Sequence, residues 1–220
     1  MTVRRPSRRR ARAALAAIAI VAVGACSATG GASPVATAGG GAGGGADCPT
    51  SEPAALPAGE TRTVTIATEL GSIVIAVQAD LSPIAAGNFV ALAACGYYDG
   101  VVFHRAAALQ DGTPFVIQGG DPPGTGRGGP GYTITDEVVT TPYARGTVAM
   151  ARTAQPNSVG SQFFIVLDDG AASILASYNT YQIIGSVSSG METADAILAA
   201  ADGELPSDPV VMTDVSVSTP

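Results

Sequence analysis

The chain has 220 residues, 46% of them hydrophobic and 13% charged, which suits one large domain or two small ones and excludes disorder of the whole chain. Six of the 11 basic residues lie in the first twelve positions, whereas all 18 acidic residues follow residue 46. Beyond residue 26 the chain has five arginines against 18 acids, a net charge of −13, which argues against nucleic acid as a partner.

The first 25 residues are typical of an export signal. Residues 1–12 are basic, and residues 13–23 form an apolar run that is too short to span a bilayer but suits a signal peptide. Small residues then lead directly to Cys26, an arrangement that resembles the bacterial lipobox. The resemblance implies a signal peptide over 1–25 and a lipid on Cys26 that anchors the protein at the extracytoplasmic face of the cell membrane. An ordinary secretory signal is the alternative.

The next part of the chain is predicted to be a tether. Residues 27–46 are almost entirely Gly, Ala, Ser and Thr, and residues 47–61 are rich in proline. Neither stretch has the periodic apolar residues that could form a buried face, so residues 26–61 are predicted to be a flexible tether. The lipidated Cys26 is the first residue of this tether. The folded domain is expected over 62–220.

The folded part opens with a predicted hairpin and a helix. Two β-branched runs, 63–68 and 72–77, are separated by a tight turn. Ser82 and Pro83 then offer an N-cap and a first-turn proline for a helix that ends at Gly96.

Short strands dominate the rest. They are expected around residues 101–104, 115–118, 146–151, 162–167 and 181–187. A second helix is predicted over 192–201, followed by an alternating strand over 210–217. Many short strands with two separated helices predict a mainly β fold, a closed eight-stranded antiparallel barrel capped by two α-helices.

Several common site chemistries do not fit the sequence. Residues 124–129 match a glycine-rich dinucleotide pattern, but Pro130 follows where that motif needs a helix, so a loop is predicted. His104 is the only histidine, and neither a nucleophile elbow nor a zinc-ligand spacing accompanies it. No metal or cofactor is expected. The adjacent carboxylates Asp136 and Glu137 are expected to be solvated.

Three sequence blocks are more specific. Residues 103–105 (Phe-His-Arg), 115–121 (Phe-Val-Ile-Gln-Gly-Gly-Asp) and 160–165 (Gly-Ser-Gln-Phe-Phe-Ile) occur in this order. Together they resemble the signature blocks of the cyclophilin family of peptidyl-prolyl isomerases, over about residues 63–217. The resemblance implies a barrel of eight strands and two helices, and an enzyme that rotates X-Pro bonds without a nucleophile, metal or cofactor.

The implied partners are proline-containing exported polypeptides, whose folding the protein would assist as a lipid-anchored monomer. Two alternatives remain open at this point: a proline-peptide-binding module with little activity, and a surface lipoprotein with structural or adhesive contacts.

The resemblance also assigns roles by position. Arg105 matches the catalytic arginine, and Gln118 and Phe115 complete the catalytic set. The substrate-binding positions are Val116, Phe164, Gln162, Ala151, Arg152, Leu175, Tyr181 and His104. Arg152 stands where asparagine is frequent in the family and is expected to add a positive charge to the substrate groove. The link over 106–114 is longer than usual.

Two cysteines remain once Cys26 is lipidated. Export would place Cys48 and Cys95 where disulfides can persist, so a bridge could pin the tether to the domain. In the alternative, Cys95 is an ordinary buried thiol beside Phe89 and Leu92, and Cys48 is free.

Overall fold

The computed structural model describes residues 47–219, so the predicted signal peptide, Cys26 and most of the predicted tether lie outside the described residues. The strands are β1 (Thr61–Thr68), β2 (Gly71–Gln78), β3 (Arg105–Ala108), β4 (Pro114–Gly119), β5 (Thr147–Met150), β6 (Phe163–Val166), β7 (Ile183–Ser189) and β8 (Asp214–Ser218). The helices are α1 (Pro83–Ala94), α2 (Gly170–Tyr178) and α3 (Met191–Ala200).

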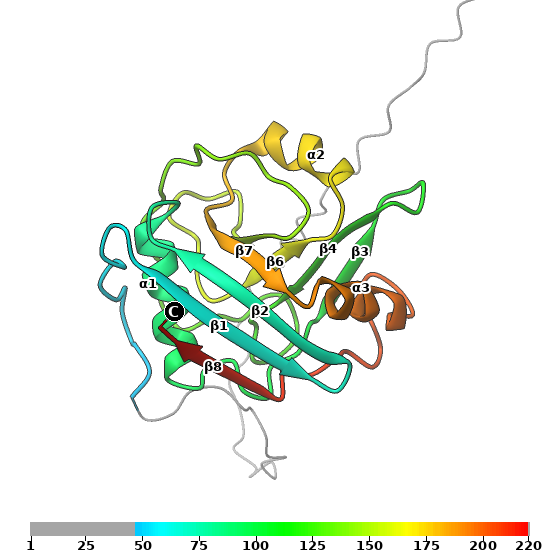
Figure 1. The fold of residues 1–220 in the computed structure, drawn as a ribbon, viewed down its shortest axis with the longest axis horizontal. Helices are drawn as coiled ribbons and strands as arrows, with labels where there is room; N and C mark the ends of the chain where they lie inside the picture. Colours follow the sequence, from blue (N-terminus) through cyan, green and yellow to red (C-terminus); the bar gives the residue numbers. More distant parts are fainter. Residues whose placement is uncertain (1–46, 220) are drawn as a thin grey trace, which may run out of the picture. The chain divides into compact units, whose positions relative to one another are not determined.

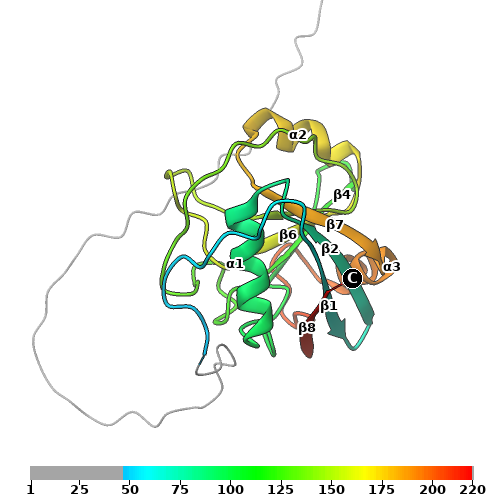
Figure 2. The ribbon, with the colours of Figure 1, turned by 60° about the vertical axis from the view of Figure 1, so that its left-hand side comes forward.

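The eight strands form one curled antiparallel sheet in the order β3-β4-β6-β5-β7-β2-β1-β8 (Figure 1). Residues of α1 and α3 contribute to the main hydrophobic core, which the curled sheet surrounds. Figures 1 and 2 show these two helices at different ends of the curled sheet, with α2 apart from both. The mainly β, antiparallel prediction is therefore confirmed.

The prediction of a closed barrel is wrong. β3 and β8 are the two edges of the sheet, and no ladder joins them. The chain bridges this gap only through an isolated pairing of Val102 with Val211 and a few backbone hydrogen bonds beside it. The strand expected at 101–104 begins only at Arg105, and β8 begins only at Asp214. The two segments that face each other are thus too irregular to close the sheet.

A third helix, α2, also corrects the prediction of two. Its sequence is rich in alanine, which favours helix, but its apolar face is short. Only Ala171 and Leu175 are buried, one helical turn apart, and Asn179 ends the helix in the left-handed conformation with φ of 45°. Two buried positions are too few to distinguish a helix from a loop by sequence pattern.

The start of α1 is stabilised differently from the prediction. Ser82 occupies the N-cap position, but its side chain makes no capping hydrogen bond. Instead the backbone N–H groups of Ile84 and Ala85 each donate to the Glu137 carboxylate at 2.9 Å. A negative charge at a helix N-terminus is favourable, so Glu137 is a structural residue rather than a solvated one.

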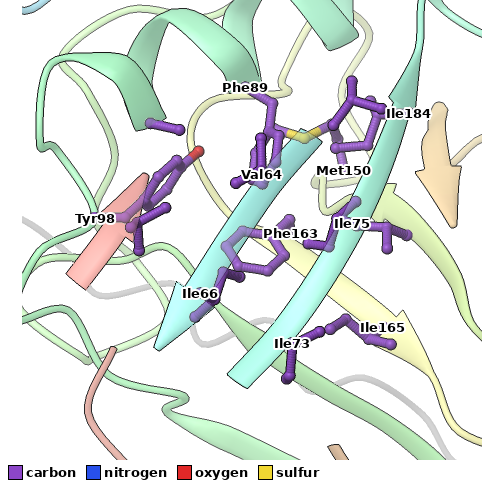
Figure 3. Packing of buried hydrophobic residues seen from close by; sticks show 14 of the residues in the cluster. Val64, Ile66, Ile73, Ile75, Phe89, Tyr98, Met150, Phe163, Ile165 and Ile184 are labelled. Carbon is purple, nitrogen blue, oxygen red and sulfur yellow. The ribbon is translucent and has the colours of Figure 1, made fainter. Parts of the chain in front are cut away.

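The core forms around the predicted hairpin and the centre of the sheet. Val64 and Ile66 of β1 and Ile73 and Ile75 of β2 are fully buried, as their alternation predicts. Figure 3 shows these side chains gathered around Phe163 of β6. Because neighbouring residues of a strand face opposite ways, an inward Phe163 directs the next residue, Phe164, to the other face of the sheet.

The segment before β1 is irregular, as predicted, but it is packed on the domain. Cys48 is joined to Cys95 by a disulfide with a Cα–Cα distance of 5.2 Å. Leu56 is buried, and its N–H donates to the Pro83 carbonyl at 2.9 Å. Residues 48–61 therefore belong to the ordered domain, which was expected to start at residue 62.

Candidate active site

One row of residues crosses the sheet on the face that points away from the main core. Arg105 of β3 pairs with Gln118 of β4, Gln118 pairs with Phe164 of β6, and Phe164 pairs with Ala149 of β5. Directly opposed residues in neighbouring strands project to the same face. The sheet therefore brings a guanidinium, an amide and a phenyl ring from separate parts of the sequence together.

An apolar patch surrounds Phe164. It forms a second hydrophobic cluster, separate from the main core, in which Phe164 is 4% exposed. The Tyr181 ring packs edge-on against Phe164, with ring centroids 5.3 Å apart. Burial raises the pKa of Tyr181, so the phenol is neutral. The predicted residues that the structure brings into this cluster are Phe115, Val116, Ala151, Phe164, Leu175 and Tyr181.

A polar relay runs alongside the patch. Arg105 Nη1 donates to Gln118 Oε1 at 3.4 Å, and Gln118 Nε2 donates to Gln162 Oε1 at 2.9 Å. Gln162 Nε2 in turn donates to the carbonyl of Gly128 at 3.0 Å. Both glutamines thus lie where they can orient the guanidinium.

A groove of about 760 Å³ adjoins the relay, lined by Gln118, Gln162, Ala151, Arg152 and the loop 126–133. Asp121 holds that loop, because its Oδ2 accepts from the backbone N–H groups of Thr125 at 2.7 Å and Gly126 at 2.6 Å. A Cβ on Gly128 would lie only 2.0 Å from Asp121 Oδ1, so this position requires glycine. The glycine-rich run is a loop, as predicted, but it also forms a wall of the groove, which sequence reasoning missed.

Arg152 does not present a free charge to the groove, contrary to expectation. Its guanidinium is ion-paired with Asp136 at 3.0 Å, and its side chain is only 11% exposed. Nη2 also donates to the Gln155 carbonyl at 2.7 Å. Asp136 is therefore not simply solvated, and Arg152 connects the segments that border the groove.

A glutamate that the sequence analysis did not single out contacts Arg105. The Nε of Arg105 donates to Glu204 Oε1 at 2.8 Å, forming an ion pair across 99 residues of sequence. Glu204 lies in the irregular segment between α3 and β8. The guanidinium is thus held on one side by Gln118 and on another by Glu204.

The long link after Arg105 is the tip of the β3–β4 hairpin. Leu109 N–H donates to the Thr113 carbonyl at 2.8 Å, closing the turn. This hairpin projects from the sheet in Figure 1. The extra residues therefore extend the edge of the site without displacing Arg105 from Gln118.

His104 lies apart from the other predicted substrate-binding residues. Its side chain is buried beneath Gly126 and lines neither the groove nor the apolar patch. Burial lowers the pKa of His104, while the nearby Asp121 carboxylate opposes that shift and Arg105 adds to it. The structure gives this histidine a packing position.

His104 is expected to make the domain less stable in mild acid. Its folded-state pKa is below the ordinary value of about 6.5, so the unfolded chain takes up a proton first as the pH falls below that value, and stability is lost. Urea denaturation at pH 7.5 and 5.5 measures this loss. In His104→Gln the loss between the two pH values should be smaller, and an equal loss would contradict the assignment.

Within residues 47–219 no three His, Cys, Asp or Glu side chains are gathered closely enough to hold a metal ion. The site consists of a guanidinium held beside an apolar patch and an open groove. This combination is the kind that binds a small apolar ring and the polypeptide on either side of it.

The comparisons with known proteins identify the class. The family model described as cyclophilin type peptidyl-prolyl cis-trans isomerase/CLD matches residues 63–217, and the chain belongs to this family. It is similar to the peptidyl-prolyl cis-trans isomerase CYP18-1 of Arabidopsis thaliana, with 42% identity over 138 residues, 60% of this chain and 80% of that one. It is 38% identical over 180 residues to peptidyl-prolyl cis-trans isomerase A of Mycobacterium tuberculosis, which covers 72% of this chain and 93% of the relative.

Solved structures agree. A crystal structure of a cyclophilin type peptidyl-prolyl cis-trans isomerase of Cryptosporidium parvum superposes with a TM-score of 0.63 and 32% identity, over 73% of this chain and 99% of that one. A structure of that protein in the presence of the dipeptide Ala-Pro gives a TM-score of 0.62 and 32% identity, over 72% and 99% of the two chains. The protein is therefore a peptidyl-prolyl cis-trans isomerase.

Proposed function

We propose that this isomerase acts outside the cytoplasm, anchored to the membrane by a lipid on Cys26, where it assists the folding of exported proteins. The disulfide between Cys48 and Cys95 is the observation that most supports this location, because such bonds persist in oxidising compartments and are rare in the cytosol. The basic and apolar residues of 1–25 and the small residues before Cys26 support it independently. None of the helices within 47–219 is long and apolar enough to cross a membrane.

The chemistry that the site must perform is rotation about a stiff bond. An X-Pro amide resists rotation because resonance must be lost, a barrier of about 18–20 kcal/mol. In the twisted state the nitrogen becomes pyramidal and able to accept a hydrogen bond. A site that binds the twisted amide more tightly than the planar one accelerates rotation about tenfold for each 1.36 kcal/mol of preference.

In this proposal the apolar patch holds the proline ring. The partly exposed rings of Phe115 and Tyr181 face the proline ring, and the buried Phe164, Val116 and Leu175 beneath them keep the surroundings poor in water. Burying the ring there fixes one side of the X-Pro bond, so that rotation moves the other side. The adjoining groove has room for the residues that flank the proline.

Arg105 supplies the hydrogen bond to the twisted amide. Its Nε is occupied by Glu204 and its Nη1 contacts Gln118, whereas Nη2 has no partner among the described residues. A guanidinium stays charged at all ordinary pH values, so the donor is always available. The inactive proline-binding module considered above is not favoured, because this donor is present and already oriented.

The lipid anchor is tested by Cys26→Ser. Wild-type protein expressed with its own leader is expected to be processed and to fractionate with membranes, because a diacylated cysteine binds firmly. Without the thiol the protein should be unprocessed or released. Ser33→Ala, a change in the same tether, is the control and should fractionate like the wild type. Processed Cys26→Ser protein that remains firmly in the membrane would contradict the anchor.

A further inference from the structure

Glu204 is the acidic residue that pairs with Arg105 at this site. Its carboxylate lies 2.8 Å from Arg105 Nε, on the guanidinium proposed to touch the substrate amide. The Glu204 side chain is 61% exposed and that of Arg105 is 30% exposed. The pair therefore borders solvent at the edge of the site.

The segment that carries Glu204 is fixed to the edge of the sheet. The carbonyl of Glu204 accepts from the Ala106 N–H of β3 at 2.9 Å. Asp202 closes the turn around it, since its carboxylate accepts from Ser207 N–H at 2.9 Å and Ser207 Oγ at 2.6 Å. The negative charge is thus held beside Arg105 by the backbone as well as by the ion pair.

Most other arginines of the domain are also neutralised by acids. Arg152, one of two arginines that line the groove, is paired with Asp136. Arg62 and Arg145 are paired with Glu60 and Asp195, so four of the five arginines in residues 47–219 form ion pairs. Within residues 47–219, Arg127 at the groove is the one arginine without an ion pair, whereas 14 of the 18 acids pair with no arginine.

We infer that Glu204 sets the charge preference of the isomerase, so that proline segments with a basic neighbour are better substrates than those with an acidic neighbour. The inference rests on the proposed contact between Arg105 and the substrate. The Cα of a residue next to the proline lies about 3.8 Å from the Cα of the proline. A charge on that residue is therefore close to the bound amide compared with the screening length of about 8 Å at physiological salt. An exposed charge pair contributes at most about fivefold, equivalent to about 1 kcal/mol, so the expected preference is a few-fold.

The test is a matched set of peptides that differ only in the residue flanking Ala-Pro: Lys, Gln or Glu. Exchange NMR gives kcat/KM for each peptide with wild type, Glu204→Gln and Glu69→Gln. Glu69 is an exposed acid in the turn between β1 and β2, so its change matches the net charge of Glu204→Gln away from the site. The kcat/KM of the Lys peptide should exceed that of the Glu peptide about threefold to fivefold with wild type and Glu69→Gln. With Glu204→Gln the difference in kcat/KM should be less than about twofold.

Charge reversal and salt complete the test. Glu204→Lys should invert the preference, and 1 M salt should bring the wild-type ratio close to one. A wild-type ratio of one at low salt, or a ratio unaffected by Glu204→Gln, would overturn the inference while leaving turnover of the neutral peptide intact. Absence of turnover even for the neutral peptide would overturn the proposed site and this inference with it. Unchanged melting temperatures show that each variant is folded.

Discussion

Arg105→Ala is expected to slow isomerisation at least tenfold while the domain stays folded. The guanidinium is the charged donor held at the edge of the apolar patch, and a tenfold loss corresponds to about 1.4 kcal/mol of transition-state stabilisation. Folding should survive because the side chain is partly exposed and exposed ion pairs contribute little to stability. A coupled or NMR assay on a proline tetrapeptide gives the rate, and thermal melting gives the stability.

Two further variants make this result specific. Arg105→Lys keeps the charge but loses the planar fork that serves Glu204, Gln118 and the substrate together, so it should also be impaired. Arg62→Ala removes an arginine of β1 that pairs with Glu60, outside the site, and should retain wild-type turnover. A folded Arg105→Ala protein with wild-type turnover would refute the mechanism.

Local patterns predicted the local parts of the fold well. The alternation around residues 63–77 specifies which side chains of the first hairpin enter the core, and β1 and β2 have that arrangement. Closure of the sheet could not be predicted in the same way. It depends on how residues 101–103 meet residues 210–212, more than 100 positions away, and no local pattern records that these segments meet through one bridge only.

The same distinction applies to the site. Arg105, Gln118 and Phe164 each belong to a recognisable block, and strand register places them side by side. Glu204 belongs to no such block, because an isolated acid in an irregular segment carries no signal of its distant partner. The pairing of Arg152 with Asp136 was missed for the same reason, and it neutralises the positive charge that this arginine was expected to add to the groove.

Removal of the disulfide should lower the stability of the domain and leave the isomerisation rate unchanged, the opposite of what is expected for Arg105→Ala. The bridge closes a loop between Cys48 and Cys95, which are 47 positions apart. In the chain-entropy model such a loop stabilises the folded state by about 4 kcal/mol, less any residual order in the unfolded chain. For a domain of this size that corresponds to a melting temperature lower by about 8–16 °C.

The double variant Cys48→Ser/Cys95→Ser measures this effect without leaving an unpaired thiol. Both cysteines pack against the main core, and neither belongs to the apolar patch or the groove, so kcat/KM well below the melting temperature should change less than twofold. Wild-type protein treated with a reductant should melt like the double variant, since both lack the same cross-link. If the double variant and the oxidised wild type have the same melting temperature, the bridge has no stabilising role. The contacts of Leu56 and its neighbours would then be sufficient to hold residues 47–60 on the domain.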